Sequence, residues 1–195
     1  MHLPNFYVYD TILSGDIMKK PLAFRIRPEN IDDIYGQEHL VGENRVLRNM
    51  IENQDIFSMI FFGPPGTGKT TAAIAIARAL NRPYRLFNAV TDNKKKLDQL
   101  FVEAEMSSGL VVIIDEVHRL NKNMQDVLLP HIENGLITII GATTSNPHFA
   151  INPAIRSRVH LFEFHARSAD DIISILHKGS QHYLPTTIDE SVIHK

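Results

Sequence analysis

The sequence contains no cysteine and no long hydrophobic run, and its charges nearly balance. The absence of cysteine excludes disulfides and thiolate metal sites, and it fits a reducing compartment. No apolar stretch approaches the ~18 residues that a membrane-spanning helix requires. The formal net charge is −2, so no overall positive field attracts nucleic acid, and any DNA contact must come from a local patch or from sequence outside this chain.

Two further signals are missing. Residues 1–20 lack a basic segment followed by an apolar core, so we expect no secretion signal and a cytoplasmic protein without membrane association. The ten histidines show no metal-binding spacing such as His-Glu-x-x-His, so we expect His118 and His131 to be hydrogen-bonding or exposed residues rather than ligands. The remaining composition is ordinary: 195 residues, 44% apolar and 22% charged, suit one domain or one domain and part of another.

The clearest motif is a glycine-rich loop. It consists of Gly63, Pro64, Pro65, Gly66, Thr67, Gly68, Lys69 and Thr70, and it matches the pattern Gly-x-x-x-x-Gly-Lys-Ser/Thr. Glycine lets backbone N–H groups point at phosphate oxygens without interference from Cβ atoms. Lys69 supplies a positive charge for the β- and γ-phosphates, and the Thr70 hydroxyl is a ligand for Mg²⁺. Because an apolar run precedes the loop and an alanine-rich segment comes after it, we predict the strand–loop–helix unit that binds a nucleoside triphosphate.

Predicted strands and helices alternate along the chain. Strands are expected at residues 58–62, 84–88, 110–114, 136–140 and 159–164. Helices are expected at residues 45–53, from the glycine-rich loop through residue 80, at 94–108 and at 121–134, with a helical turn at 152–157 and another helix after residue 168. Continuous apolar runs such as 110–114 are typical of strands buried on both faces of a parallel sheet. The alternation predicts a three-layer α/β fold with a central five-stranded parallel sheet that binds ligands at its carboxyl edge.

Shifts in composition suggest the domain boundaries. Residues 1–20 differ in character from the residues after them, and Met18-Lys19-Lys20 resembles a natural start, so we expect an N-terminal extension that is non-native or disordered. Residues 21–166 are expected to form the nucleotide-binding base domain. Residues 167–195 are expected to form an incomplete helical lid.

Side chains suited to hydrolysis stand near the predicted strand ends. Asp115 and Glu116 come directly after the strand at 110–114; one carboxylate can hold Mg²⁺ while its neighbour polarises a water molecule for in-line attack. The run 141–147 places a hydroxyl where it can orient that water. The run 155–158 contains two arginines, and an arginine at a domain edge can reach a neighbouring subunit's γ-phosphate as an arginine finger, worth ~10³-fold or more in rate.

Together these motifs resemble those of AAA+ ATPases of the clamp-loader group. The resemblance is greatest to the family of the bacterial replication-associated recombination protein A, whose eukaryotic relative is the Werner helicase-interacting protein. It is carried by the runs 25–28, 34–37, 62–71, 114–119, 129–133 and 141–144, and it extends from about residue 22 to residue 164. It implies a P-loop NTPase fold of the AAA+ type, Mg²⁺-dependent ATPase activity, and ATP and Mg²⁺ as ligands.

The resemblance also implies roles for single residues. Lys69 and Thr70 would be the Walker A lysine and Mg²⁺ ligand, and Asp115 and Glu116 the Walker B pair, with Asp115 on the metal and Glu116 as the catalytic base. Thr144 would be the sensor-1 residue. Arg158 would be the finger that acts in trans, with Arg156 as its rival. The implied nucleotide contacts outside the glycine-rich loop are Tyr35, Gly36, Arg27 and Thr71.

For the whole protein, the resemblance implies a homo-oligomer, expected to be a tetramer, that acts in replication-fork maintenance and recombination. Its implied partners are DNA ends or forked DNA and the single-stranded-DNA-binding protein, and its implied location is the cytoplasm, near the nucleoid. The family's sensor-2 arginine and oligomerisation domain are expected beyond Lys195. Because the finger must come from a neighbour, we expect the 195-residue chain alone to hydrolyse ATP weakly or not at all.

Other interpretations remain open at this point. One alternative is a nucleotide-gated scaffold without hydrolysis, although such scaffolds tend to lose part of the catalytic set. Another is a helicase, because residues 115–118 spell a DExH box, but the Ser-Ala-Thr motif of such helicases is absent. Residues 121–124 nearly spell a guanine-reading box, but Met124 lacks the required carboxylate, so we expect ATP rather than GTP. The basic run 94–96 either contacts DNA phosphates or is a solvated helix end.

Overall fold

The structure is a computed structural model, and it describes residue 28 and residues 30–183. The predictions for residues 1–20, for Arg27 and for the lid after residue 183 lie outside the described residues. The chain separates into two units, residues 28–167 and a second unit made of residues 1–27 and 168–195. The described element of the second unit is α10 (Ala169–Tyr183), the helix predicted after residue 168; its identity as part of a lid stays a prediction.

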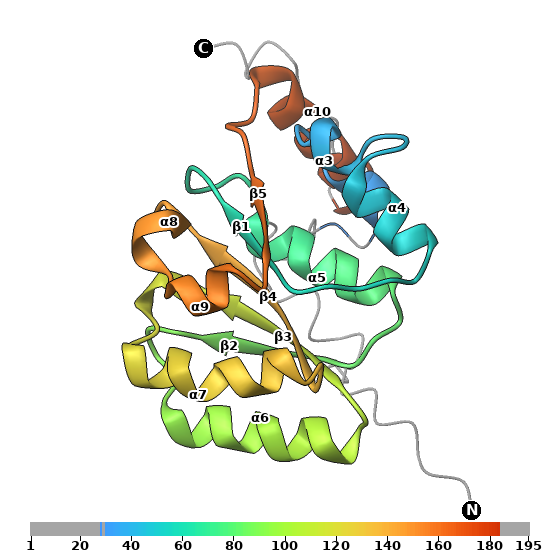
Figure 1. The fold of residues 1–195 in the computed structure, drawn as a ribbon. Coiled ribbons are helices and arrows are strands. Elements are labelled where there is room, and N and C mark those ends of the chain that lie inside the picture. The colour runs from blue at the N-terminus through green and yellow to red at the C-terminus, as the bar shows by residue number, and fades with distance from the viewer. Residues whose placement is uncertain (1–27, 29, 184–195) are drawn as a thin grey trace, which may run out of the picture. The chain divides into compact units, whose positions relative to one another are not determined.

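Residues 28–167 are built around a parallel sheet of five strands, as predicted (Figure 1). The strands are β1 (Met59–Phe62), β2 (Tyr84–Asn88), β3 (Leu110–Asp115), β4 (Ile137–Thr143) and β5 (His160–Glu163). Their order across the sheet is β2-β3-β4-β1-β5, and every neighbouring pair is parallel. Because all strands run the same way, their carboxyl ends meet at one edge of the sheet.

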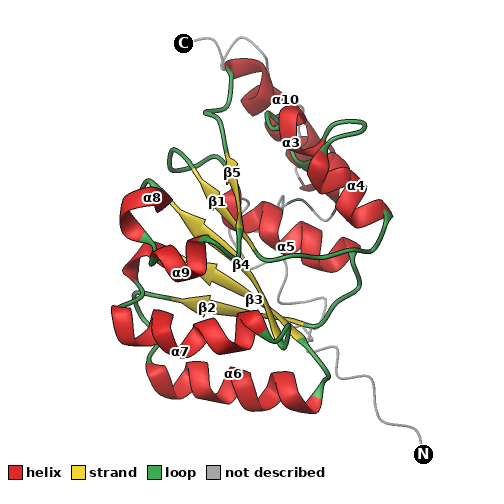
Figure 2. Cartoon of the chain, viewed as in Figure 1, coloured by secondary structure: helices red, strands yellow, loops and turns green. Residues whose placement is uncertain are grey.

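Helices cover both faces of this sheet (Figure 2). The longer ones are α5 (Lys69–Ala79), α6 (Lys94–Met106) and α7 (Lys122–Glu133). The shorter ones are the 3₁₀ helices η1 (Ile31–Asp33) and η2 (Val117–Arg119) and the α-helices α3 (Glu38–Val41), α4 (Val46–Glu52), α8 (Pro147–Ala150) and α9 (Pro153–Arg156). One core joins α3, α4 and α5 to one face of the sheet, and a second core joins α6 and α7 to the other. These layers confirm the predicted three-layer fold.

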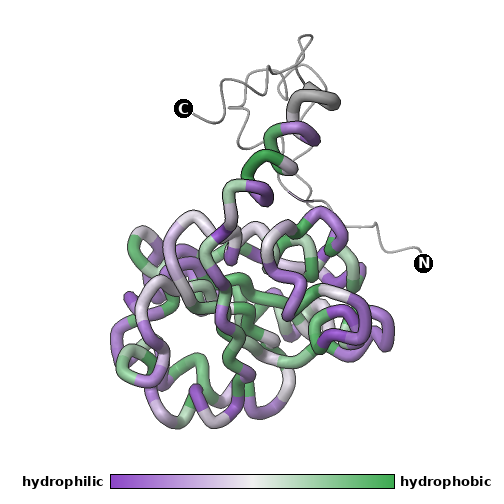
Figure 3. The backbone as a smooth tube through the Cα atoms, turned by 90° about the horizontal axis from the view of Figure 1, so that it is seen from above, coloured by the Kyte–Doolittle hydropathy of each residue, from purple (hydrophilic) through white to green (hydrophobic). Residues whose placement is uncertain are grey.

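The central strands supply both cores at once. In β1, Phe61 belongs to the core under α5 and Ile60 to the core under α6 and α7, and both side chains are fully buried. Ile113 and Ile114 divide in the same way in β3. Successive side chains of a strand point to opposite faces, which explains why these strands are continuous apolar runs. In Figure 3 the hydrophobic colour accordingly gathers on interior segments and the hydrophilic colour on outer turns.

The predicted boundaries are close to the observed ones, with one difference at β4. The Asn121 side chain caps α7, accepting a hydrogen bond from Met124 N (2.9 Å). The strand predicted at 136–140 continues to Thr143, because Gly141 and Thr143 remain paired with Ile60 and Phe62 of β1. Within residues 30–183, no helix combines the length and the apolar composition that crossing a membrane requires.

Candidate nucleotide-binding site

Residues 63–70 connect the end of β1 to the start of α5, as the motif predicts. Gly63 and Gly68 have φ angles of 141° and 90°, in the region that favours glycine. A Cβ atom on Gly63 would collide with the backbone oxygen of Phe164, and one on Gly68 would collide with the guanidinium of Arg167. The loop therefore needs glycine at both positions for conformation and for space, and the segment after β5 lies directly against it.

The Lys69 side chain is buried, with 7% of the residue exposed. Its Nζ donates hydrogen bonds to the carbonyl oxygens of Gly63 (3.0 Å) and Pro64 (2.7 Å). Burial lowers the pKa of the Lys69 ammonium, and the charges of Glu116 and Asp115 oppose this shift without cancelling it. The ammonium thus lies inside the loop, with three donors that can be shared between loop carbonyls and phosphate oxygens.

The end of β3 reaches the loop. Thr70 Oγ1 donates a hydrogen bond to Asp115 Oδ1 at 2.8 Å, which joins the start of α5 to the end of β3. A hydroxyl and a carboxylate are oxygen ligands of the kind that Mg²⁺ takes, and Mg²⁺ usually completes its shell with waters and substrate phosphates. In the part of the chain that the structure describes, no group of three or more His, Cys, Asp or Glu side chains is placed to hold a metal. The Thr70 hydroxyl and the Asp115 carboxylate thus fit an Mg²⁺ ion whose other ligands are waters and phosphates.

Glu116 is held in an unusual position directly after β3. Its backbone is left-handed (φ 52°, ψ 45°), which is uncommon for a non-glycine residue. Its Oε2 atom is buried and has no hydrogen-bond partner among the described residues, although His118 Nδ1 lies 3.3 Å away. The side chain as a whole is 37% exposed, so the rest of the carboxylate remains reachable by water.

The two threonines at the end of β4 have different surroundings. Thr143 is buried; its Oγ1 lies 2.8 Å from His118 Nδ1 and accepts a hydrogen bond from Ser145 N (3.0 Å). Thr144, the predicted sensor residue, is exposed. Sequence reasoning did not identify Thr143 or assign His118 a role beyond hydrogen bonding. The period of two along a strand could have indicated Thr143, but only if the end of β4 had been known.

The loop that contains Tyr35 and Gly36 is anchored by its neighbour Gln37. The Gln37 side chain is fully buried; it donates to His165 O (2.9 Å) and accepts from His165 N (3.0 Å). His39 stacks on His165, with ring centroids 4.0 Å apart. Because His165 lies in the segment that contacts the glycine-rich loop, these bonds hold residues 35–37 to that same segment. No pattern in the sequence indicates this connection.

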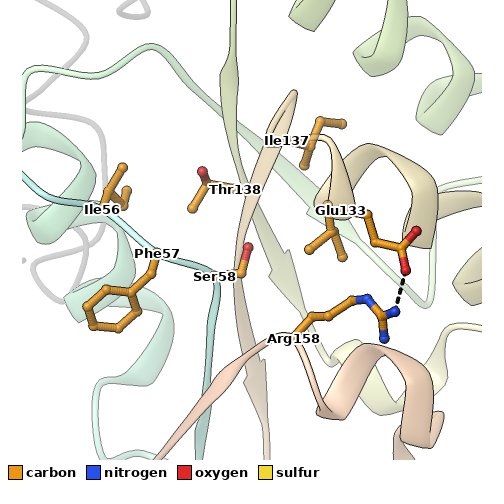
Figure 4. Close-up of a pocket in the computed structure, with 9 residues that line it drawn as sticks. Ile56, Phe57, Ser58, Glu133, Ile137, Thr138 and Arg158 are labelled. Atoms are coloured by element: carbon orange, nitrogen blue, oxygen red, sulfur yellow. Dashed lines mark ion pairs between the residues drawn. The ribbon is translucent and has the colours of Figure 1, made fainter.

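Arg158 lies near the amino ends of the strands, whereas the glycine-rich loop follows their carboxyl ends. It lines a pocket of about 560 Å³ together with Ser58 and Ile137, which stand at the amino ends of β1 and β4 (Figure 4). Its guanidinium donates to Ala154 O (2.7 Å) and forms an ion pair with Glu133 (2.5 Å). The glycine-rich loop comes after the carboxyl end of β1, so the fold does not bring Arg158 to the loop of its own chain.

The remaining candidates have ordinary contacts. Arg156 donates to a backbone carbonyl of α8 (2.5 Å). Lys96 pairs with Asp92 (2.6 Å), whereas the other two lysines of the basic run are exposed. His131 stacks on Phe101 with ring centroids 3.8 Å apart. Within the basic run, Lys94 and Lys95 are thus the exposed lysines that could contact DNA phosphates.

A glycine-rich phosphate loop and an acidic strand end on a five-stranded parallel sheet define a P-loop nucleotide-binding protein. The family model of ATPases associated with various cellular activities (AAA) matches residues 59–167. This chain belongs to the AAA family.

Its relatives agree with the resemblance seen in the motifs. Replication-associated recombination protein A of Bacillus subtilis is 46% identical over 182 residues, which cover 90% of this chain and 43% of the relative. The protein of the same name from Escherichia coli is 44% identical over 161 residues, which cover 80% and 36%. ATPase WRNIP1 of Dictyostelium discoideum is 34% identical over 177 residues, which cover 89% and 20%. The chain thus spans less than half the length of these relatives.

Solved structures confirm the fold. A RuvB structure from Thermotoga maritima is similar with a TM-score of 0.72 and 24% identity, covering 86% of this chain and 58% of RuvB. Another RuvB structure from Thermotoga maritima, described as a Holliday junction branch migration motor, has a TM-score of 0.68 and 26% identity, covering 80% and 54%.

Proposed function

We propose that this chain binds ATP together with Mg²⁺ and hydrolyses it to ADP and phosphate. The observation that carries the proposal is the 2.8 Å hydrogen bond between Thr70 Oγ1 and Asp115 Oδ1. It joins the phosphate-binding loop to the acidic end of β3, and it leaves Glu116 next to the same point. Phosphoryl transfer needs little more from a protein than this positioning of phosphates, metal and water.

Each residue of the loop and the strand end has a distinct role in this proposal. The backbone N–H groups of residues 63–70 and the Lys69 ammonium hold the β- and γ-phosphates. Thr70 and Asp115 hold Mg²⁺, which neutralises phosphate charge when it is bound. Glu116 accepts a proton from water as the water oxygen bonds to the γ-phosphorus and the bond to the β–γ bridging oxygen breaks.

The remaining roles extend the site beyond this core. Thr144 orients the attacking water, and Tyr35, Gly36, Arg27 and Thr71 contact the nucleotide. Arg158 reaches the γ-phosphate of a neighbouring subunit. Its place at the amino ends of the strands supports action in trans, because it lies at the edge of the sheet opposite its own loop.

The test is steady-state ATPase activity with ATP binding measured beside it, on the polypeptide that carries this chain. Glu116→Gln is expected to lower kcat by about 100-fold or more, because general-base catalysis contributes roughly 10²–10⁴-fold, while ATP still binds. Lys69→Ala is expected to abolish binding. Glu105→Gln, the same change on the exposed side of α6, is the matched control. A Glu116→Gln variant as fast as the unchanged protein would contradict hydrolysis at this site and favour a nucleotide-gated scaffold.

The whole protein is proposed to act as a homo-oligomer, a tetramer, on forked DNA or DNA ends in replication-fork maintenance and recombination. We further propose the single-stranded-DNA-binding protein as a partner and a cytoplasmic location near the nucleoid. The relatives named for replication-associated recombination support this assignment. Forked DNA is expected to stimulate ATP turnover more than closed circular duplex DNA of the same length, and equal rates on both would argue against it.

A further inference from the structure

The ends of β3 and β4 are linked by a contact that the ATPase motifs do not require. One nitrogen, His118 Nδ1, faces two oxygens: Thr143 Oγ1 at 2.8 Å and Glu116 Oε2 at 3.3 Å. The three side chains form a hydroxyl–imidazole–carboxylate row that ends on the residue proposed as the catalytic base. Thr143 is the last residue of β4, and Glu116 directly follows β3, the neighbouring strand.

The row is shielded from water. Thr143 is 1% exposed and the His118 side chain 14% exposed, and the Oε2 atom of Glu116 is buried. Among the residues that the structure describes, Oε2 accepts no hydrogen bond, and His118 Nδ1 lies close enough to become its donor. A buried carboxylate oxygen is stabilised by a hydrogen-bond donor, whereas a nitrogen lone pair facing it is repulsive. The orientation of Glu116 therefore depends on what His118 presents to it.

Thr143 decides what His118 presents. If Nδ1 carries its proton, it can donate to Thr143 Oγ1 or to Glu116 Oε2. If Nδ1 is unprotonated, the Thr143 hydroxyl donates a hydrogen bond to it, and Glu116 receives no hydrogen bond from His118. Bonding to Thr143 and bonding to Glu116 thus compete for the same nitrogen, and a movement of Thr143 shifts the balance.

The position of Thr143 is in turn linked to the phosphate-binding loop. Thr143 is paired with Phe62 of β1, and Phe62 directly precedes Gly63, the first residue of that loop. A change at the start of the loop would need to cross only one strand pairing to reach Thr143, which contacts His118.

We propose that Thr143 and His118 are positioning residues that set the orientation of the Glu116 carboxylate according to the state of the phosphate-binding loop. This inference rests on the proposed ATPase function. It assigns no chemical step to either residue: they act through Glu116. Thr143 differs in this from Thr144, which is exposed and is proposed to orient water directly.

The test compares matched pairs of variants by kcat and by ATP affinity. Thr143→Val keeps the side-chain shape without the hydroxyl, and Thr143→Ser keeps the hydroxyl. His118→Phe keeps the ring without a nitrogen, and His118→Asn restores a nitrogen near the place of Nδ1. We expect Thr143→Val and His118→Phe to lower kcat about tenfold or more, because a small displacement of a catalytic group is costly, with ATP affinity unchanged within about twofold. Thr143→Ser and His118→Asn should recover most of the rate.

A double variant and a control variant separate positioning from a general structural role. In Glu116→Gln, adding Thr143→Val should cause no further loss, because there is no carboxylate base left to orient. Thr91→Val, the same change in an exposed turn after β2, should leave kcat unchanged. If Thr143→Val does not fold, the Thr143→Ser and His118 variants decide the question. Full rates in Thr143→Val and His118→Phe beside an inactive Glu116→Gln would overturn this inference alone, whereas a fully active Glu116→Gln would overturn the proposed function itself.

Discussion

Lys69 and Glu116 each place an ionisable group in a buried or strained position. Burial lowers the pKa of the Lys69 ammonium. One oxygen of Glu116 is buried without a hydrogen bond in the described part of the chain, and its backbone is left-handed, which costs a non-glycine residue about 1–2 kcal/mol. Such placements concentrate at functional sites, where the surrounding fold maintains them. In the proposed function, a bound triphosphate would accept hydrogen bonds from Lys69, and the attacking water would donate one to Glu116.

Gly68 offers a test of the loop at a single Cα atom. Gly68→Ala would strain a φ of 90° and drive a methyl group against Arg167, so the loop must shift. We expect ATP affinity to fall at least about tenfold, equal to about 1.4 kcal/mol of binding free energy. Gly135→Ala, at a φ of 73° in open space, is the control: it should lose about 1 kcal/mol of stability and keep its ATP affinity. Calorimetric titration with ATP and urea unfolding measure the two quantities, and equal affinities in both variants would contradict the expectation.

Site residues were predictable where the chemistry lies within a short motif. The glycine-rich loop and the pair Asp115 and Glu116 were found this way, and the Thr70–Asp115 bond brings them together as expected. Thr143 was missed because the predicted strand stopped at residue 140, so the alternation of side chains was not followed to the residue that contacts His118. The closeness of Arg167 to the space beside Gly68 was not predictable, because only the tertiary fold brings the two residues together.

Among the secondary-structure elements, the three central strands were predictable from their composition. β1, β3 and β4 are buried on both faces, so burial leaves a continuous apolar run in each. The polar links between elements left no such trace. Gln37 bonds to His165 across 128 positions of sequence, and nothing near either residue indicates the partner.

Gln37→Met is expected to weaken the fold by removing this link. Methionine fills a similar volume but removes both hydrogen bonds to the His165 backbone, and each such bond contributes about 0.5–1.5 kcal/mol. The free energy of unfolding in urea should therefore fall by about 2 kcal/mol. Gln99→Met, on the exposed side of α6, is the control and should stay within about 0.5 kcal/mol of the unchanged protein. A similar small loss in both variants would show that the Gln37 bonds contribute little.

Asp92 joins the end of β2 to the first turn of α6. Its Oδ2 accepts hydrogen bonds from Asn88 N (2.7 Å) and Lys96 Nζ (2.6 Å). Burial raises the pKa of the Asp92 carboxyl, but the bond from Lys96, the bond from Asn88 and the Lys96 charge together lower it below its usual value. A carboxyl with a lower pKa in the folded state stabilises the fold above its unfolded-state pKa of about 4, and the contribution is lost as pH falls through the folded-state pKa.

Asp92→Asn should therefore destabilise the protein in a pH-dependent way. We expect a loss of about 1 kcal/mol at neutral pH, since one charge-assisted contact is removed. The difference from the unchanged protein should shrink as pH falls below about 4. Urea unfolding across this range measures it, with Asp98→Asn on the exposed side of α6 as the control. A difference that stays constant down to about pH 3 would assign the effect to packing rather than to charge.

In the whole molecule, the two halves of the proposed reaction centre lie at opposite edges of one sheet. The phosphate-binding loop and Glu116 come after the carboxyl ends of the strands, and Arg158 precedes β5 beside their amino ends. The ion pair with Glu133 and the bond to Ala154 hold Arg158 on its own edge. In the proposed function, a complete site would thus need two copies, arranged head to tail. Arg158 of one copy would then face the phosphate-binding loop of the next.

Mixing two inactive variants tests this arrangement. Glu116→Gln lacks the base and keeps its arginine, whereas Arg158→Ala lacks the arginine and keeps its base. In oligomers assembled from equal amounts, about a quarter of the junctions pair an intact base with an intact arginine, so ATP turnover should exceed the sum of the separate variants and approach about a quarter of the unchanged rate.

The control for this experiment is Arg82→Ala, an exposed arginine, which should be fully active alone. Both inactive variants must also form oligomers of the unchanged size, since a failure to assemble would lower the rate without involving the finger. If Arg158 acted within its own chain, every site in the mixture would lack either base or arginine. The mixed rate would then equal the average of the two variants, and the shared site would be ruled out.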